Sequence, residues 1–277
     1  MEGLQSILPV AWAVGHFVRI YWICVITRCA ETERVPPASG VMVSAVELPA
    51  GLLTVSSELT RDGVMKAVFP ALDGFAPSTA PASHAAKRAF DLLLGTALLL
   101  LFTPVMMLVS LAVALESPGP VLFCQKRTGR GGKTFPIFKF RSMRVMEKGG
   151  DVRQAVEGDD RITRVGKVIR KLSLDELPQL FNVIAGQMSL VGPRPHAILH
   201  DDYYGAHISA YVLRQQVKPG ITGWAQVNGS RGPTPSIEIM RRRVALDAWY
   251  VANHSLALDI KILVRTPLAV LSTRNAH

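Results

Sequence analysis

The sequence predicts an α+β protein, mainly α, that attaches to a membrane, and three observations support this. Residues 92–115 contain no charged side chain, and such a run is longer than the about 20 apolar residues that a membrane helix needs. Short apolar or alternating segments at 121–123 and 134–141 are typical of two paired strands. Much of the remaining chain has the apolar spacing of helices.

Composition points to anionic partners. The 277 residues include 31 Lys and Arg against 21 Asp and Glu, with a pI near 9.9 and a mean hydropathy of +0.25. A chain of this length can bury a substantial core, and its positive charge favours nucleic acid, anionic lipid or phosphorylated substrates. The charge is concentrated in residues 124–171, which hold 14 basic and 5 acidic side chains.

The first part of the chain carries few signals. Residues 1–84 are predicted to be a poorly defined N-terminal segment and linker, with an apolar stretch at 8–26 that Arg19 interrupts. The three cysteines are an odd number without metal-ligand spacing, so neither a zinc site nor a disulfide framework is indicated. A reducing compartment is the simpler interpretation. The cysteines are Cys24, Cys29 and Cys124.

Residues 85–116 form the predicted membrane segment. Thr103-Pro104 lies near its middle, and a central proline removes a backbone hydrogen bond and kinks a helix. The basic residues Lys87 and Arg88 favour a cytoplasmic start. A bent helix that returns to the face it entered is one interpretation, and a proline-kinked spanning helix is the other.

The segment after the membrane helix, residues 117–277, is predicted to be a cytosolic domain. It begins with a β-hairpin whose tip, residues 125–133, is basic and rich in glycine. Residues 159–170 are predicted to form an amphipathic helix that packs on the core or lies in the membrane interface. A Pro/Gly-bounded loop at 217–229 carries Trp224, which would suit stacking on a base. The alternative is that this loop is a plain structural turn. Two helices are expected at 238–254 and 255–271.

Two adjacent carboxylates, Asp175 and Glu176, follow the basic run and precede an apolar helix. A metal-bound phosphate ester could be attacked at such a pair. The same residues also fit a capping box that starts with Ser173 and ends with Glu176, which has no catalytic meaning. The helix is expected to begin near Asp175 and to stop at Gly186.

Taken together, six blocks in order along the chain resemble the bacterial sugar transferases, also called monotopic phosphoglycosyl transferases. The resemblance covers residues 87–271. The blocks are Lys87-Arg88-x-Phe90-Asp91, Ser117-Pro118-Gly119-Pro120, Lys139-Phe140-Arg141-Ser142-Met143, Asp159-x-Arg161-Ile162-Thr163, Ser173-Leu174-Asp175-Glu176-Leu177-Pro178-Gln179 and Val191-Gly192-Pro193-Arg194-Pro195.

The resemblance implies a monotopic protein with a re-entrant membrane helix bent at Thr103-Pro104, in the inner membrane with its catalytic domain on the cytoplasmic face. It implies transfer of a sugar 1-phosphate from a UDP-sugar to undecaprenyl phosphate, with release of UMP. Asp175 is implied as the nucleophile and Glu176 as a ligand of Mg²⁺. The substrate-binding residues that it implies are Lys139, Arg141, Arg194 and Asp247.

The identity of the transferred sugar depends on two further blocks. The blocks around 224–234 and 243–250 are most similar to the family branch that transfers glucose 1-phosphate in exopolysaccharide synthesis. Galactose 1-phosphate and N-acetylhexosamine 1-phosphate are the alternatives. A non-catalytic protein that binds anionic membrane lipids through residues 124–171 is the alternative from another class. No nucleic-acid-binding pattern is present, and a homodimer is left open.

Overall fold

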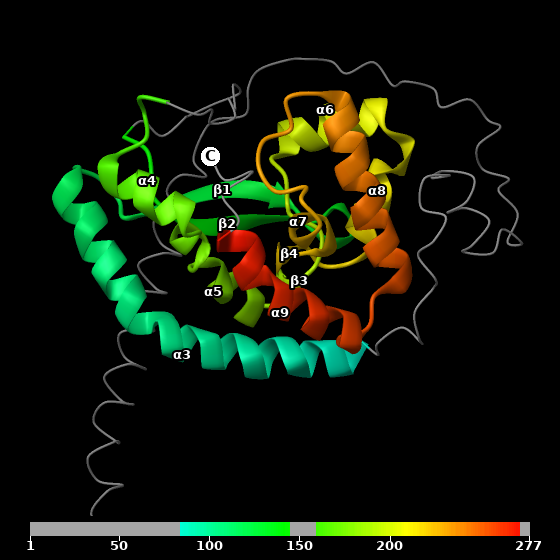
Figure 1. The fold of residues 1–277 in the computed structure, drawn as a ribbon, viewed down its shortest axis with the longest axis horizontal. Coiled ribbons are helices and arrows are strands. Elements are labelled where there is room, and N and C mark those ends of the chain that lie inside the picture. Colours follow the sequence, from blue (N-terminus) through cyan, green and yellow to red (C-terminus); the bar gives the residue numbers. More distant parts are fainter. Residues whose placement is uncertain (1–83, 145–158, 272–277) are drawn as a thin grey trace, which may run out of the picture. The chain divides into compact units, whose positions relative to one another are not determined.

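The structure is a computed structural model that describes residues 84–144 and 159–271. The predicted segment 1–84, apart from its last residue, lies outside the described residues, as do Cys24 and Cys29. The described part is mainly helical, with two small two-stranded sheets (Figure 1). The prediction of an α+β fold, mainly α, is therefore confirmed.

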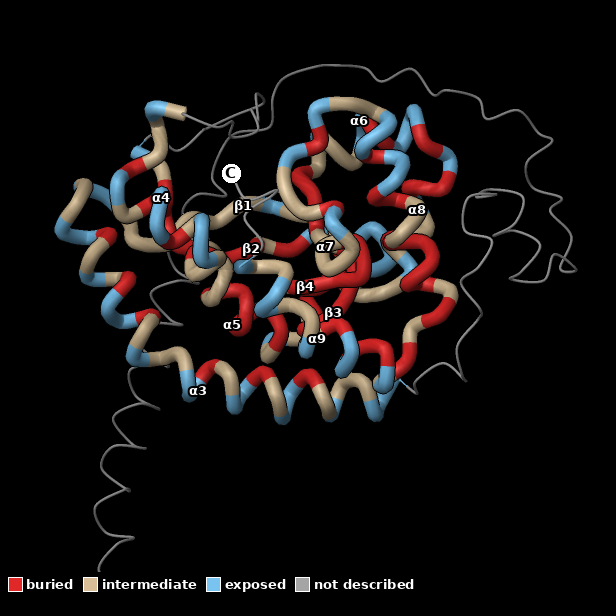
Figure 2. The backbone as a smooth tube through the Cα atoms, viewed as in Figure 1, coloured by how far each residue is buried: buried red, intermediate tan, exposed pale blue. Residues whose placement is uncertain are grey.

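Helix α3 (His84–Glu116) contains the predicted membrane segment and starts close to its predicted first residue. It is long and apolar enough to cross a membrane, and Figure 1 shows that it changes direction partway along. One side of the helix packs on the body of the protein and the other is exposed (Figure 2). Its exposed large side chains are Leu92, Leu93, Leu100, Leu101, Met107, Leu108, Leu111 and Leu115.

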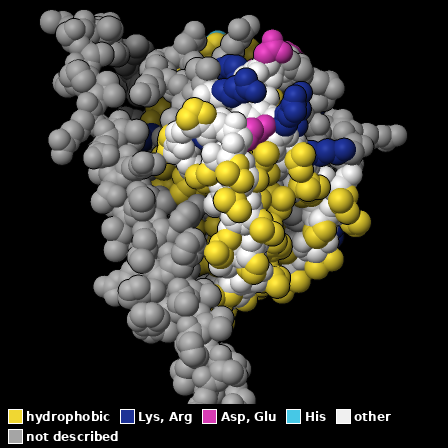
Figure 3. All heavy atoms as spheres, turned by 90° about the vertical axis from the view of Figure 1, so that its left-hand side faces the viewer, with side chains coloured by type: hydrophobic (Ala, Val, Ile, Leu, Met, Phe, Trp, Pro, Cys, Tyr) yellow, Lys and Arg dark blue, Asp and Glu magenta, His cyan; other side chains and the backbone are white. Residues whose placement is uncertain are grey.

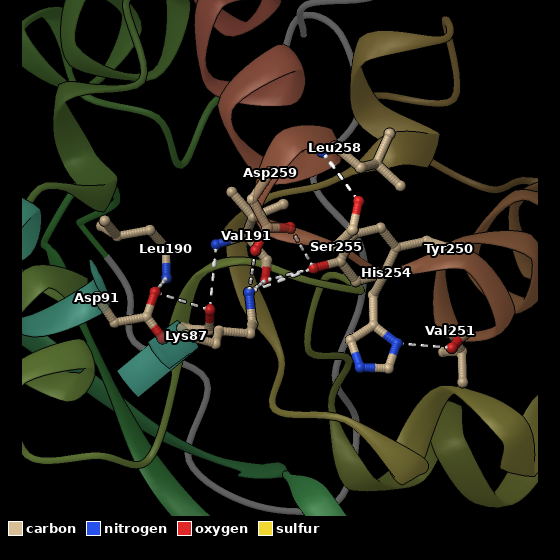
Figure 4. A network of polar contacts seen from close by, with 11 residues as sticks. Lys87, Asp91, Leu190, Val191, Tyr250, Val251, His254, Ser255, Leu258 and Asp259 are labelled. Carbon is tan, nitrogen blue, oxygen red and sulfur yellow. Dashed lines mark hydrogen bonds and ion pairs between the residues drawn. The ribbon is translucent and has the colours of Figure 1, made fainter. Parts of the chain in front are cut away.

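The start of α3 is joined to the C-terminal part of the fold by buried polar contacts (Figure 4). The Lys87 ammonium lies 2.6 Å from the Asp259 carboxylate, and the hydroxyl of Tyr250 donates to the other oxygen of Asp259 at 2.7 Å. The Asp91 carboxylate accepts from the hydroxyl of Ser189 and from the backbone N–H of Leu190. Charged groups tolerate burial when they are paired in this way.

The end of α3 is joined to helix α4 (Arg164–Lys171). The Glu116 carboxylate accepts from the backbone N–H of Arg164 at 2.7 Å and from that of Val165 at 3.0 Å. These donors belong to the first turn of α4, where a carboxylate is favourable because the N–H groups are otherwise unpaired. Both ends of α3 therefore contact the same folded body.

Strands β1 (Leu122–Thr128) and β2 (Thr134–Phe140) form the predicted antiparallel hairpin. Strand β1 extends further than predicted, so the tip is shorter and contains the 3-10 turn η2 (Arg130–Gly132). The buried side chains of β2 include Phe135, Ile137, Phe138 and Phe140.

Helix α5 (Gln179–Ile184) packs against β2 through the side chain of Asn182. Its amide oxygen accepts from the N–H of Phe138, and its amide nitrogen donates to the carbonyl of Pro136. Asn182 thus pairs with the free edge of β2 as a neighbouring strand would. The helix stops as predicted, with Gly186 in a left-handed conformation at φ 83°.

A second sheet pairs β3 (Ser189–Val191) in parallel with β4 (Gly220–Thr222). The connection between them contains α6 (Ile198–His207) and the 3-10 helix η4 (Ser209–Gln216). The predicted loop at 217–229 therefore holds a strand, and also the short helix α7 (Trp224–Val227).

Trp224 does not have the role that the loop prediction gave it. Its side chain is buried and stacks on Trp249, with ring centroids 4.7 Å apart. A ring covered in this way packs the core, so the interpretation as a stacking platform for a base is wrong.

The last two helices agree with prediction. Helix α8 (Ile237–Asn253) begins after Ser236, whose hydroxyl accepts from the backbone N–H of Ile239, and α9 (Leu256–Leu271) follows. Helix α4 is shorter than the predicted helix at 159–170. Its neighbour Leu172 is 46 % exposed.

Candidate active site

Asp175 and Glu176 lie in a single 3-10 turn, η3 (Leu174–Glu176), between α4 and α5. The predicted capping box is wrong, because the Ser173 hydroxyl makes no capping bond. It accepts instead from the guanidinium of Arg231. The regular helix begins only after Pro178.

Ser173 has a left-handed backbone at φ 55°, and it is the only non-glycine residue with a positive φ among residues 84–144 and 159–271. This conformation costs an L-amino acid about 1–2 kcal/mol. Strain of this kind often occurs at functional sites. The bend that Ser173 makes separates η3 from α4, and the Arg231 contact supports it.

Asp175 is buried, with 8 % of the residue exposed. Burial and the charge of Glu176 raise its pKa to about 6, although Lys139, Arg170 and Arg194 act in the opposite direction. Asp175 makes none of the ion pairs found among the described residues. It is therefore a buried carboxylate without a direct cation partner, which is the state expected of a poised nucleophile.

Glu176 has the opposite environment. Burial favours its neutral form, but Arg194 and Lys139 outweigh this and hold its pKa well below the usual range. The Lys139 ammonium lies 2.9 Å from Oε1, Arg194 Nη1 donates to Oε2 at 2.9 Å, and Arg194 Nη2 pairs with Oε1. Two adjacent carboxylates whose environments separate their pKa values commonly have different roles.

The backbone of Arg194 is fixed by a second buried pair. Arg214 donates from Nη2 to the Arg194 carbonyl at 2.6 Å and from Nε to the Asp247 carboxylate at 2.8 Å. Asp247, predicted to bind substrate, thus reaches the site only through Arg214 and Arg194. Its place in the structure is that of a positioning residue.

Arg141 lies elsewhere. Its guanidinium donates to the carbonyl groups of Pro118 and Ser117, just after α3. No contact joins it to Asp175 or Glu176 among the described residues. The structure therefore brings Lys139, Arg194 and the two carboxylates together and does not bring Arg141 to them. Thr103 and Pro104 lie within α3, where the Thr103 hydroxyl donates to the Leu99 carbonyl.

The two carboxylates suit a hard divalent cation, because Mg²⁺ prefers oxygen ligands and is often held by one or two carboxylates plus substrate phosphates. Each carboxylate oxygen has two lone pairs, so Glu176 retains acceptor sites beside its cation contacts. No group of three or more potential metal ligands occurs in residues 84–144 and 159–271. The described part of the chain therefore does not supply a closed metal site by itself.

Comparison with family models matches residues 82–273 to the model described as bacterial sugar transferase. This match covers well over half of the 277 residues. The chain belongs to the bacterial sugar transferase family. The resemblance drawn from the sequence blocks is confirmed.

The transferase is similar to several curated proteins. One from Caulobacter vibrioides, named UDP-glucose:undecaprenyl-phosphate glucose-1-phosphate transferase, is 53 % identical over 191 residues, which are 69 % of this chain and 72 % of that protein. A protein of the same name from Escherichia coli is 53 % identical over 180 residues, 65 % of this chain and 39 % of that protein. The chain thus spans about two fifths of the Escherichia coli relative.

A more distant relative carries another sugar in its name. A UDP-N-acetylgalactosamine-undecaprenyl-phosphate N-acetylgalactosaminephosphotransferase from Aeromonas hydrophila is 44 % identical over 186 residues, which are 67 % of this chain and 44 % of that protein. Two sugars are therefore named among the relatives of this transferase.

Sequence reasoning missed two arginines of the site in the transferase. Arg214 lies in η4 without any recognisable motif around it, and its pairing with Asp247 joins parts of the chain far apart in sequence. Arg231 belongs to the block at 224–234, but its contact with Ser173 depends on the left-handed turn. Neither of these two contacts can be predicted from the local sequence pattern alone.

Proposed function

We propose that this transferase moves glucose 1-phosphate from UDP-glucose to undecaprenyl phosphate, giving undecaprenyl-diphosphate glucose and UMP, as a membrane step of exopolysaccharide synthesis. The names of the relatives from Caulobacter vibrioides and Escherichia coli support the donor and acceptor. The observation that carries the chemistry is the buried, unpaired Asp175 beside a Glu176 clamped by Lys139 and Arg194.

In the first step, an oxygen of Asp175 attacks the phosphorus that bears the sugar. A new bond forms between that oxygen and phosphorus, the bond from phosphorus to the bridging oxygen breaks, and UMP leaves with the bond electrons. The product is an aspartyl-phosphate sugar. The raised pKa of Asp175 is consistent with a carboxylate that lacks strong stabilisation of its charge and is therefore a better nucleophile.

In the second step, a phosphate oxygen of the lipid attacks the same phosphorus. The bond to Asp175 breaks, the free carboxylate is restored, and the lipid carries the sugar diphosphate. Each step exchanges one energy-rich phosphate bond for another, so the protein has to supply mainly position and charge. Arg194 and Lys139 are the cations that we propose for the phosphate charge.

Mg²⁺ is the proposed cofactor, with Glu176 as its protein ligand together with phosphate oxygens of the substrate. When bound, it would neutralise charge on the diphosphate. The donor chemistry of the two carboxylates supports this assignment. The protein's own residues orient the donor: Arg194 offers a planar fork of donors that suits phosphate oxygens, and Asp247 and Arg214 hold its backbone.

We also propose that residues 85–116 form a re-entrant helix bent at Thr103-Pro104, with residues 117–277 as the catalytic domain on the cytoplasmic face of the inner membrane. Supporting this, Lys87 at one end of α3 and Glu116 at the other both contact the same folded body. A helix that crossed the membrane would leave its ends on opposite sides.

The exposed apolar side chains are consistent with a membrane face. Figure 3 shows hydrophobic side chains gathered on the lower part of one face, with Lys and Arg side chains above them. Helices α4 and α9 contribute further exposed apolar residues, as expected of helices that lie in a membrane interface. These residues are Val168, Leu172, Ile260, Val264, Leu268 and Leu271.

A panel of UDP-sugars tests the function. The full chain in detergent would be given undecaprenyl phosphate, Mg²⁺ and radiolabelled UDP-glucose, UDP-galactose or UDP-N-acetylgalactosamine, and UMP and lipid-linked label would be measured. We expect the highest kcat/KM with UDP-glucose and no product after Asp175→Asn. Preference for UDP-N-acetylgalactosamine would select the activity named for the Aeromonas relative, and full turnover by Asp175→Asn would exclude the nucleophile.

A further inference from the structure

Arg194, which pairs with Glu176, also lines a small hollow. The hollow has a volume of about 20 Å³ and is lined by the hairpin tip, by the segment after β3 and by η4. This volume is enough for about one water molecule or one small polar group. Its lining includes Thr128, Arg194, His196, Asp201, Tyr211 and Arg214.

His196 lines this hollow and has one buried ring nitrogen that no hydrogen bond uses. Its side chain is 8 % exposed, and Nε2 is buried without a hydrogen-bond partner among residues 84–144 and 159–271. The other ring nitrogen, Nδ1, lies 2.6 Å from the Tyr211 hydroxyl and 3.1 Å from Arg214 Nη1. Burial and the charges of Arg214 and Arg243 hold the pKa of His196 well below its usual range, so the ring is neutral.

Asp201 presents a second unused atom. Its Oδ1 accepts from the Tyr211 hydroxyl at 2.6 Å, whereas Oδ2 is buried and has no partner within the described part of the chain. A buried polar group without a partner costs about 1–3 kcal/mol, and folded proteins leave few of them. His196 and Asp201 both line the hollow, and each has one such atom. A hydrogen-bonding group from outside the chain, either a water or a hydroxyl of a ligand, would pair with them.

The chemistry of His196 Nε2 and Asp201 Oδ2 indicates which kind of ligand group would pair with them. A hydroxyl can donate or accept, so it pairs with Nε2 of His196 in either tautomer, and it can donate to Oδ2 of Asp201. A phosphate oxygen would be repelled by the Asp201 carboxylate, and an apolar group would leave both atoms unpaired. The hollow therefore fits one hydroxyl group of a sugar.

We propose that His196 and Asp201 bind a sugar hydroxyl of the nucleotide donor, next to the phosphate-binding Arg194. This inference rests on the proposed function. Arg194 connects the two places, because its guanidinium pairs with Glu176 while the residue also lines the hollow. A donor whose diphosphate lies at Arg194 would carry hydroxyl groups on both sides, from the hexose and from the ribose.

Two substitutions of His196 separate binding from structure. Asn places its amide near the position of Nδ1, so His196→Asn keeps a partner for Tyr211 and removes the hydrogen-bonding group at the position of Nε2. Gln reaches further and places its amide near Nε2, so His196→Gln keeps that group. Loss of a single neutral hydrogen bond changes affinity by roughly tenfold.

The experiment measures dissociation constants of UDP-glucose and UMP by calorimetry on the full chain in detergent, in an Asp175→Asn background so that the donor is not consumed. We expect His196→Asn to raise the dissociation constant of UDP-glucose about tenfold and His196→Gln to change it by less than about threefold. His207→Asn, at an exposed position on α6, is the control and should bind like the parent. Thermal unfolding of each variant would check that it is folded.

The UMP arm identifies the sugar. If the hydroxyl belongs to the ribose, His196→Asn weakens UMP and UDP-glucose in parallel, and if it belongs to the hexose, only UDP-glucose is weakened. Equal affinity of all variants for UDP-glucose would overturn the inference. A larger loss of affinity in His196→Gln than in His196→Asn would also overturn it, because this result is expected if His196 acts only through its Nδ1 contact with Tyr211. If the unmodified enzyme binds UDP-glucose but never turns it over, the proposed function is contradicted. The affinities of the His196 variants would still test whether His196 binds the donor.

Discussion

At the scale of single residues, the central feature is that two neighbouring carboxylates have opposite environments. Asp175 is buried without an ion pair and its pKa is raised, whereas Glu176 is paired with Lys139 and Arg194 and its pKa is lowered. The left-handed Ser173 makes this difference possible, because it turns η3 away from α4. If the capping box had formed, a regular helix would have started at Ser173 in place of the 3-10 turn η3.

The raised pKa of Asp175 predicts how activity depends on pH. Asp175 must be ionised to attack, and kcat/KM reports the ionisation of the free enzyme. Since its pKa is about 6, we expect kcat/KM for UDP-glucose to decline about tenfold per pH unit below that value. If kcat/KM stays constant down to pH 5 while the protein remains folded, then Asp175 either ionises at a lower pH or is not the nucleophile.

The same shift predicts a gain in stability from Asp175→Asn. A carboxyl whose pKa is raised from 3.8 to about 6 in the folded state destabilises the fold by up to about 3 kcal/mol above pH 6. The penalty is absent below the unfolded pKa. Asp175→Asn should therefore unfold at a higher temperature than the parent at pH 8, with the difference vanishing near pH 3.5. Exposed Asp202→Asn serves as control, and a loss of stability at pH 8 would contradict the assigned environment.

At the scale of elements, Asn182 positions the site by fixing α5 on the hairpin. Its side chain satisfies the Phe138 N–H and the Pro136 carbonyl on β2, and the next residue of that strand, Lys139, reaches Glu176. We expect Asn182→Ala to lower the free energy of unfolding by about 3 kcal/mol, because it leaves buried backbone groups unpaired. Asn228→Ala, which removes one partly exposed bond to Trp224, should cost about 1 kcal/mol or less. If chemical denaturation gives equal losses of unfolding free energy for Asn182→Ala and Asn228→Ala, the contacts of Asn182 with β2 do not stabilise the fold more than an ordinary surface hydrogen bond does.

Elements with strong local patterns were predicted, and those that depend on distant partners were not. The long apolar run, the hairpin and the last two helices follow from periodicity and turn residues. Strands β3 and β4 have three residues each and pair across 28 intervening residues, so no local pattern marks them. Trp224 was assigned to a ligand because its partner Trp249 cannot be known from the loop sequence.

At the scale of the whole molecule, the site forms where segments distant in sequence meet. Lys139 and Arg194 were predicted from family blocks, and the structure brings both to Glu176. Arg141 was predicted in the same way but holds the turn after α3. It follows the last residue of β2, where the backbone N–H of Arg141 pairs with the Val121 carbonyl and its guanidinium reaches Ser117 and Pro118. Family blocks thus identify important residues without separating those at the site from those that support the fold.

The proposed membrane topology predicts which side each end of α3 faces. Ala85→Cys and Pro118→Cys would be introduced separately in a cysteine-free version of the chain, and a membrane-impermeant thiol reagent would be applied to inverted and to right-side-out vesicles. Both positions are exposed in the structure. We expect both to be labelled in inverted vesicles alone. Labelling of the two positions from opposite sides would show a spanning helix.

The most direct test of the account is the mass of the protein after exposure to donor alone. The full chain would be incubated with UDP-glucose and Mg²⁺ without undecaprenyl phosphate, quenched, and measured intact and after proteolysis. We expect an added hexose phosphate on the peptide that contains Asp175, lost on treatment with hydroxylamine as an acyl phosphate should be, and absent from Asp175→Asn. UMP release without any covalent adduct, or an adduct on another residue, would contradict the claim that Asp175 holds the sugar phosphate between the two steps.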